Sequence, residues 1–452
     1  MASRKRKSSK STKRRQGKGL SGNPQRRAQQ LQERDAADLL RQQSRWAGSF
    51  NPGRRSWPWW AESHDRVLAR VRAVEWPTRL LDIEALSGQI AGDEFYERLN
   101  APGPGTGLTP AGWLQALAEA AIKAMGADFT ADGKEWPKLW AFCCGLAGEE
   151  SLEELEAWAD VIAERGLAPV PGIPVPWYQP TAGTDVLVAR DAYGARFLLI
   201  APFSDPSQPA DPDHWYAWDI DWCADGLVVA AGAYGSTAEA LAEWRVFAGP
   251  SAATAELASC PPELGIRLLD PALADSVQAE SVLGDEPAEF LREIPRLSRR
   301  AGALTTSLGH LLSDEPFSPL AGSLDSAIED FLDWHTEHAD KSPDVRDGAA
   351  EALELLLAEW GPDVPPDERA FYACSPHRIQ ACASILRDSY ESDWVDRALS
   401  LLPDWTQWCA SKTALDAEAV GRALTAARAE AAILASETHT VTEDEAPFRR
   451  PE

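Results

Sequence analysis

The sequence lacks paired cysteines and long apolar segments. None of its seven cysteines forms a Cys-x-x-Cys motif, which argues against a zinc ribbon or a thioredoxin-type redox site. No stretch of about 18 apolar residues is present, so we predict no membrane-spanning helix and no membrane partner. No apolar segment follows the basic N-terminus, so we predict no secretory signal and expect the protein in the reducing cytoplasm.

Motifs that bind nucleotides or carry common catalytic groups are also missing from the sequence. There is no GxxxxGK[ST] phosphate loop, GxSxG nucleophile turn, kinase signature or dinucleotide fingerprint. The glycine-rich stretch 103–107 follows no predicted strand and contains no lysine that would reach a phosphate. We therefore predict no cofactor, and a binding role is favoured over an enzymatic one.

The first 32 residues contain no acidic side chain, although the whole chain carries a formal charge of −26. The remaining 33 of the 44 basic residues stand against all 70 acidic residues, so the rest of the chain carries −37. Clustered basic residues neutralise phosphates and bind nucleic acid without sequence preference. We predict that nucleic acid is bound by Arg4, Lys5, Arg6, Lys7, Lys10, Lys13, Arg14, Arg15, Lys18, Arg26 and Arg27.

Three other interpretations of this basic arm remain open. It can be a solubilising tail, a targeting signal, or a segment that docks on its own acidic body and makes the protein a structural scaffold. No aromatic residue precedes Trp46, so base stacking is not indicated. The nineteen tryptophans, spread along the acidic remainder, indicate several packed domains, which we predict bind protein partners.

The predicted fold class is mainly α with a small α+β domain. Apolar residues recur at helical spacing in the N-terminal and C-terminal regions, whereas period-two patterns between short turns mark strands in the middle. The predicted organisation is a disordered basic arm running into a charged helix (1–45), a helical domain (46–165), a Pro-rich linker (166–182), an α+β domain (183–275), an irregular connection (276–323), a helical bundle (324–435) and a polar tail (436–452).

The α+β region predicts an antiparallel sheet followed by a helix. Strands are expected over 184–190, 195–203, 215–221 and 227–234. Ser236 and Glu239 form a capping-box pattern at the start of a helix over 236–250. Strands joined by short turns and followed by one helix predict a sheet that is covered on one face. Elsewhere, helices are expected to begin at Pro110, Pro343 and Pro376.

A metal-dependent enzyme is the alternative function, and the first candidate metal site is the segment 213–222, DHWYAWDIDW. On a strand, Asp219 and Asp221 point to the same side, where two carboxylates can hold a divalent cation. Asp213 and His214 precede them and would add ligands. The competing interpretation, which we favour, is a half-buried strand with aromatic residues inward and both acids in water.

The second candidate metal site is the segment 330–340, DFLDWHTEHAD. His335 and His338 share one face of a predicted helix, and histidines with nearby carboxylates bind zinc. The spacing differs from the HExxH pattern of metalloproteases, and a solvated polar helix face is favoured.

Cys374 and His377 are a further candidate, because they are spaced as a nucleophile and base at a helix start. A buried structural cysteine is the favoured interpretation.

Overall fold

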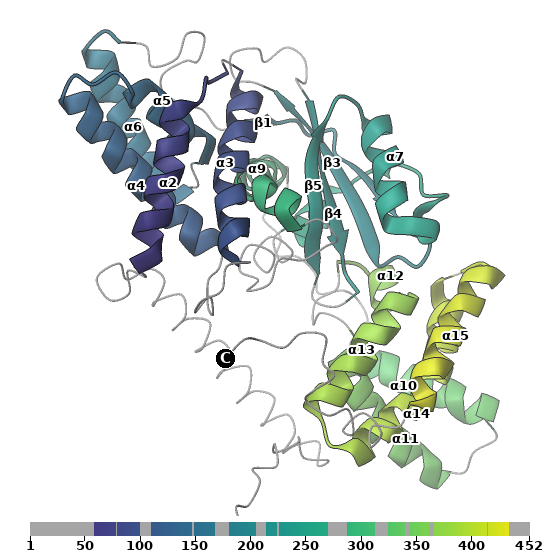
Figure 1. Cartoon of the computed structure of the whole chain (residues 1–452). Helices are drawn as coiled ribbons and strands as arrows, with labels where there is room; N and C mark the ends of the chain where they lie inside the picture. The colour runs from purple at the N-terminus through teal and green to yellow at the C-terminus, as the bar shows by residue number, and fades with distance from the viewer. Residues whose placement is uncertain are drawn as a thin grey trace, which may run out of the picture.

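The computed structural model describes residues 58–433 except for 78, 100–109, 147–148, 168–179, 205–213, 224–225, 270–286, 312–323, 340–342, 361–365 and 414. Within these residues the fold is mainly α with a small antiparallel sheet (Figure 1), which confirms the predicted class. The basic arm, the charged helix after it, most of the predicted linker and the polar tail lie outside the described residues.

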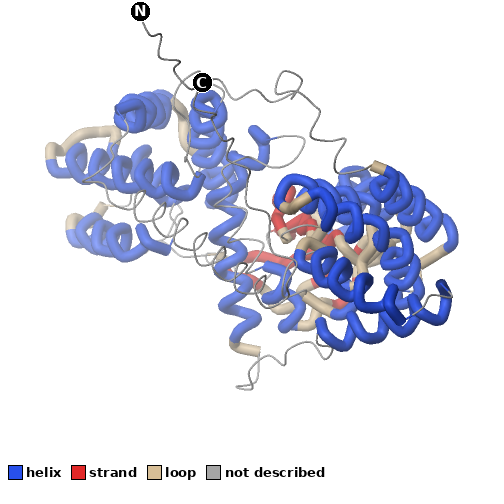
Figure 2. Tube along the Cα trace, turned by 90° about the horizontal axis from the view of Figure 1, so that it is seen from below, coloured by secondary structure: helices blue, strands red, loops and turns tan. Residues whose placement is uncertain are grey.

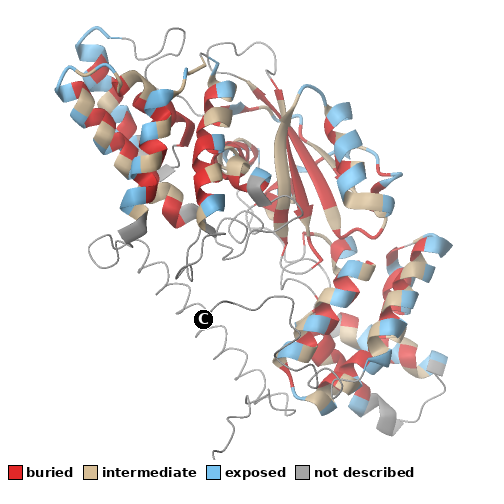
Figure 3. Ribbon diagram, viewed as in Figure 1, coloured by how far each residue is buried: buried red, intermediate tan, exposed pale blue. Residues whose placement is uncertain are grey.

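In the described part of the chain, five helices precede the sheet. They are α2 (Pro58–Ala73), α3 (Leu80–Leu99), α4 (Pro110–Thr130), α5 (Trp136–Leu146) and α6 (Glu149–Glu164). Helix α5 is buried along almost its whole length because the sequence Leu139–Leu146 contains no charged residue. The surrounding helices are amphipathic and turn their apolar faces toward it. Buried residues accordingly occupy the inner faces of these helices (Figure 3).

The sheet is antiparallel throughout, with the strand order β5-β4-β3-β2-β6, and β1 pairs with β3. The predicted strands are confirmed within a few residues. The Gly194 backbone, with φ of 85°, closes the β2–β3 turn, where the Asp191 side chain accepts hydrogen bonds from the amides of Gly194 and Ala195. The strands are β1 (Thr181–Ala182), β2 (Leu187–Arg190), β3 (Arg196–Ser204), β4 (His214–Asp221), β5 (Leu227–Tyr234) and β6 (Ala258–Ser259).

Helix α7 (Thr237–Ala248), followed by the short helix η1 (Gly249–Ala252), covers one face of the sheet. It begins as predicted, because the Ser236 side chain accepts a hydrogen bond from the Glu239 amide. The Glu239 carboxylate accepts a hydrogen bond from the Gly235 amide, whereas a capping box would use the amide of Ser236. Trp244 of α7 packs with residues of β3 and β4 in a separate apolar cluster, so this face is buried.

The opposite face is covered as well, which corrects the prediction of a sheet with one covered face. The cover is helix α9 (Pro287–Gly309), a 23-residue helix within the segment 276–323 that was predicted to be an irregular connection. Pro295 lies inside α9 and interrupts the pattern that indicates a helix. Its apolar residues nevertheless recur every three or four positions, and those buried against the sheet and the N-terminal helices include Leu291, Ile294, Leu297, Ala301, Leu304 and Leu308.

Helices α3 and α9 approach closely because two glycines lie where they meet. A Cβ atom on Gly88 would lie 2.1 Å from the backbone oxygen of Arg292, and one on Gly92 would lie 2.7 Å from the Arg292 backbone nitrogen. The apolar core therefore continues from the N-terminal helices through α9 to one face of the sheet. In the view from below, helices lie on both sides of the strands (Figure 2).

The C-terminal helices form a second unit with its own apolar core. Helices α11 and α13 begin at Pro343 and Pro376, and α4 begins at Pro110, as predicted. At α13, the side chain of Ser375 accepts a hydrogen bond from the Arg378 amide. The helices are α10 (Leu324–Ala339), α11 (Pro343–Ala358), α12 (Glu368–Phe371), α13 (Pro376–Ser389), α14 (Ser392–Thr413) and α15 (Ala417–Ala432).

Candidate functional site

The two carboxylates of the first predicted metal site have different surroundings. Both oxygens of Asp219 accept hydrogen bonds from Arg196, at 2.9 and 2.6 Å, and one also accepts from the indole of Trp244 at 2.9 Å. Burial raises the pKa of Asp219, while the Arg196 pair opposes that shift. Asp221 caps the Cys223 amide at 2.8 Å and lies 3.7 Å from His377.

The expectation that both acids lie in water was wrong for Asp219, which is only 5% exposed. The strand alternation itself was correct, since Trp218 and Ile220 face the opposite core. Helix α7 covers the Asp219 side of the sheet, which strand periodicity does not reveal. His214 falls on the Trp218 side by the same alternation, so it cannot join Asp219 in one ligand set, and Asp213 lies outside the described residues.

The histidines of the second predicted metal site lie on α10, in the C-terminal unit. His335 is buried, stacks on Phe331 and makes a 3.1 Å contact with Asp404. His338 stacks on Trp334 and contacts the backbone oxygen of that residue at 2.8 Å. Within the described residues, no three His, Cys, Asp or Glu side chains gather as a metal-binding group. The structure therefore does not bring the four predicted ligands together.

The cysteines offer no activated thiol. All seven are buried and unpaired with one another. Burial raises the pKa of Cys374 to about 12, so its thiolate is disfavoured near neutral pH, although the residue precedes a helix N-terminus. The His377 side chain is 69% exposed and faces Asp221 instead. The favoured interpretation of Cys374 as a structural residue fits this burial.

A buried ionic cluster, not predicted from the sequence, joins the helices to the sheet. The two oxygens of Glu84 on α3 accept hydrogen bonds from Arg299 and Arg300 on α9, at 2.8 and 2.7 Å. Arg299 also donates to the Cys144 backbone oxygen on α5, and Arg300 donates to His214 on β4. Burial by itself would raise the pKa of Glu84, but the two arginines outweigh it and hold that pKa below its usual value.

We interpret this ionic cluster as structural, because all three charged members are at most 7% exposed. A buried pair of this kind costs about 3–5 kcal/mol to break, since the surviving charge remains buried without its partner. No sequence signal could have paired these residues, because Glu84 and Arg299 are 215 positions apart. Arg300 also lies over the rings of Phe203 and Tyr216.

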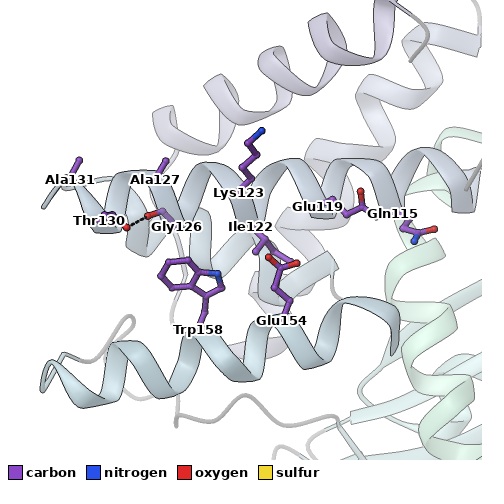
Figure 4. A pocket seen from close by; sticks show the side chains of 10 residues that line it. All are labelled: Gln115, Glu119, Ile122, Lys123, Gly126, Ala127, Thr130, Ala131, Glu154 and Trp158. Atoms are coloured by element: carbon purple, nitrogen blue, oxygen red, sulfur yellow. Dashed lines mark hydrogen bonds between the residues drawn. The ribbon is translucent and has the colours of Figure 1, made fainter. Parts of the chain in front are cut away.

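A groove lies between α4 and α6 (Figure 4). It has a volume of about 860 Å³, within the range of ligand and peptide sites. Trp158 and Glu154 extend from α6 toward α4, whereas Lys123 points away from α6. The full lining is Gln115, Glu119, Ile122, Lys123, Gly126, Ala127, Thr130, Ala131, Glu154 and Trp158.

The groove has an apolar floor because of a glycine. A Cβ atom on Gly126 would lie 2.4 Å from the Trp158 ring, so only glycine lets that ring lie against α4. The ring also packs edge-on against Phe129, with the centroids 5.8 Å apart. Ile122 is almost fully buried beneath. The groove thus exposes part of the Trp158 ring, while Ile122 and Gly126 beneath it are buried.

Helix α6, which forms one side of the groove, is acidic. Glu154 lines the groove, and Glu153, Glu156, Asp160 and Glu164 are exposed on the other faces of the same helix. The basic residue just after this helix, Arg165, is engaged elsewhere, because it lies 3.7 Å from Asp132 and over the Phe129 ring. The sequence analysis did not single out this helix. Its signal was present in EESLEELEAWADVIAE, where Glu154 and Trp158 are four residues apart and therefore share one face.

Comparisons with known proteins give no functional assignment: no family model, no curated protein and no solved structure matches the chain. Among the helices that the structure describes, none is both long and apolar enough to cross a membrane. The predicted nucleic-acid-binding residues, all in the basic arm, lie outside the described residues. The charge distribution and the groove between α4 and α6 are therefore the features from which a function can be inferred.

Proposed function

We propose that the protein is a cytoplasmic binding protein whose basic arm contacts nucleic acid without sequence preference while its acidic helical surfaces bind protein partners. The observation that carries this proposal is the charge division, with eleven basic and no acidic residues in 1–32 against −37 in the remainder. A polyanion is repelled by the body and attracted by the arm. The arm is therefore the part of the chain suited to phosphate contacts.

The surroundings of the candidate metal ligand Asp219 and of the disfavoured nucleophile Cys374 also support a binding role. Asp219 is held by Arg196 and Trp244, and Cys374 is a buried thiol. A catalytic group must be reachable by its substrate and protonated appropriately for its task. Neither side chain meets both conditions, whereas the acidic side chains of α6 are exposed to solvent and suited to a partner.

The test is the salt dependence of nucleic-acid binding by the full chain. Fluorescence anisotropy of a labelled 20-nucleotide single strand would be measured between 50 and 300 mM KCl. Each phosphate neutralised contributes a slope of about −0.7 in the log–log plot, so eleven contacts set a limit near about −8. We expect binding at 50 mM that weakens steeply along such a slope.

The matched control is a full-length variant in which the eleven basic residues of the arm are replaced by glutamine. It keeps the chain length and the acidic body, and we expect it to lose binding at every salt concentration. Equal binding by this variant would move nucleic-acid contact to another part of the chain. Absence of binding by the unmodified protein at 50 mM would reject the proposal.

A further inference from the structure

We infer that the groove between α4 and α6 binds residues 13–27 of the chain's own basic arm, with Leu20 against Trp158. This inference does not depend on nucleic-acid binding. It assigns the self-docking interpretation of the arm to a defined surface, which is formed by the Trp158 ring packed on Gly126 and by the acidic residues of and beside the groove.

Charge complementarity is the first argument for this occupant. The segment 13–27, KRRQGKGLSGNPQRR, contains six basic residues and no acidic one. Glu119 and Glu154 line the groove, helix α6 exposes four further acidic side chains beside it, and Arg165 is already paired with Asp132. Lys123, the basic residue of the lining, points away from α6 (Figure 4). Long basic side chains can also lay their methylene stems along an indole face while their charges reach the carboxylates.

The apolar content of the segment is the second argument. Leu20 is the one large aliphatic residue among positions 3–27. Glycines stand beside it at positions 19 and 22, and glycine allows close approach of a backbone to a surface. The partly exposed ring of Trp158, which lines the groove, is a hydrophobic surface of matching character. Burying a leucine side chain against that ring removes apolar surface from water, which favours docking.

The length of the intervening chain is the third argument. Thirty residues, 28–57, separate the segment from the start of α2 at Pro58. Fully extended, they reach about 100 Å, and with the predicted charged helix over 28–45 they still reach about 70 Å, whereas the whole of α4 is about 30 Å long. Helix α2 packs against α4, so the chain enters the described fold beside the helix that forms the groove. An intramolecular ligand of this kind has an effective concentration near millimolar.

The test is site-directed photo-crosslinking in the full-length protein. Ser21→Cys places one thiol beside Leu20, and the seven native cysteines are at most 6% exposed, so a benzophenone maleimide labels the new thiol selectively. After irradiation in low salt, cross-linked peptides are identified by mass spectrometry. We expect most adducts within α4 and α6, around Gly126 and Trp158, and a loss of at least threefold in 500 mM NaCl.

Variants in the same background separate docking in the groove from general attraction. We expect Leu20→Ser, and independently Glu153→Gln with Glu154→Gln, to lower the α4–α6 adducts at least threefold. The matched control is Asp388→Asn with Glu391→Gln, which removes two exposed acids from the C-terminal unit and should leave the adducts unchanged. Adducts spread evenly over the acidic surface, or equal losses in the control, would overturn the inference.

Mixing the labelled protein with an isotopically heavy, unlabelled copy identifies which chain supplies the groove. Adducts to light peptides support docking within one chain. Adducts mainly to heavy peptides would instead show exchange of arms between two copies and overturn the intramolecular proposal. No nucleic acid is present in this experiment, so its failure leaves the anisotropy test of nucleic-acid binding independent.

Discussion

His64 is a buried histidine with aromatic neighbours, and it links the stability of the N-terminal helices to pH. Its ring lies 5.7 Å from that of Trp113 and 6.2 Å from that of Trp60, and the residue is 8% exposed. Burial lowers the pKa of His64 to about 4, against the opposing attraction of Asp65 and Glu94. In the folded protein, His64 is therefore neutral throughout the range in which an exposed histidine becomes charged.

We predict that acidification from pH 6.5 to 4 destabilises the protein through His64. The unfolded chain takes up a proton below about pH 6.5 while the folded chain does not, so the free energy of unfolding falls by up to about 3 kcal/mol across this window. His64→Phe should flatten this part of the curve measured by urea unfolding. His310→Phe, at an exposed position, should leave the curve unchanged, and equal slopes for both variants would contradict the prediction.

At the residue scale, the sequence predicted side-chain positions correctly where the geometry of one short segment determines them. The alternation along β4 correctly separated Asp219 from Trp218, because strand geometry alone sets that choice. The burial of Asp219 depends on Trp244, which is 25 positions away. The Glu84 pairs depend on still more distant residues. These polar contacts are tertiary, and one sequence contains no period or spacing that reveals them.

At the scale of elements, the α3–α9 contact depends on glycines that bring two backbones together. We predict that Gly88→Ala destabilises the protein by at least about 2 kcal/mol, because the new Cβ must displace the backbone of α9. The clash is with a backbone oxygen at 2.1 Å, which no side-chain rotation can relieve. The gain in helix propensity, about 1 kcal/mol, is smaller than this cost. Urea unfolding of the full chain measures the difference.

Gly421→Ala on α15 is the matched control for this substitution. A Cβ atom there would have no neighbour within 4 Å, so only the propensity gain remains and we expect a stabilisation of about 0.5–1 kcal/mol. The two substitutions are chemically identical and both lie in helices. Equal effects on the free energy of unfolding would show that the close approach of α3 and α9 is not tight in solution.

Helix starts were the most predictable elements, because their chemistry is local. Ser375 before Pro376 and Ser236 before α7 both cap their helices as expected. Helix α9 was missed because Pro295 interrupts its pattern, and its omission led directly to the error about the uncovered sheet face. The α4–α6 groove was not predicted, since it depends on the packing of Gly126 against Trp158.

At the scale of the whole molecule, two apolar cores meet at the β2–β3 turn. Tyr193 in that turn is counted among the buried residues of the C-terminal core, and its hydroxyl donates to the Ala419 backbone oxygen at 3.3 Å. Nearby, Arg190 pairs with Asp367 through two hydrogen bonds. The sheet unit thus inserts one aromatic side chain into the helical unit, and we expect this contact to couple the folding of the two.

We predict that Tyr193→Ala reduces this coupling. Removing a buried aromatic side chain costs about 3–5 kcal/mol. Here the lost contact is the one between the β2–β3 turn and the core of the C-terminal helices. In scanning calorimetry, the ratio of calorimetric to van't Hoff enthalpy should rise, because the two units then melt as more nearly separate steps.

The control for this prediction is Leu353→Ala, which truncates a fully buried residue inside the C-terminal core and costs about 2–5 kcal/mol. It weakens the helical unit by a comparable amount while the turn with Tyr193 stays intact. We expect a lower melting temperature with a smaller change in the enthalpy ratio than in Tyr193→Ala. If both variants change the ratio equally, general destabilisation of the helical unit explains the result, and Tyr193 has no special role in joining the units.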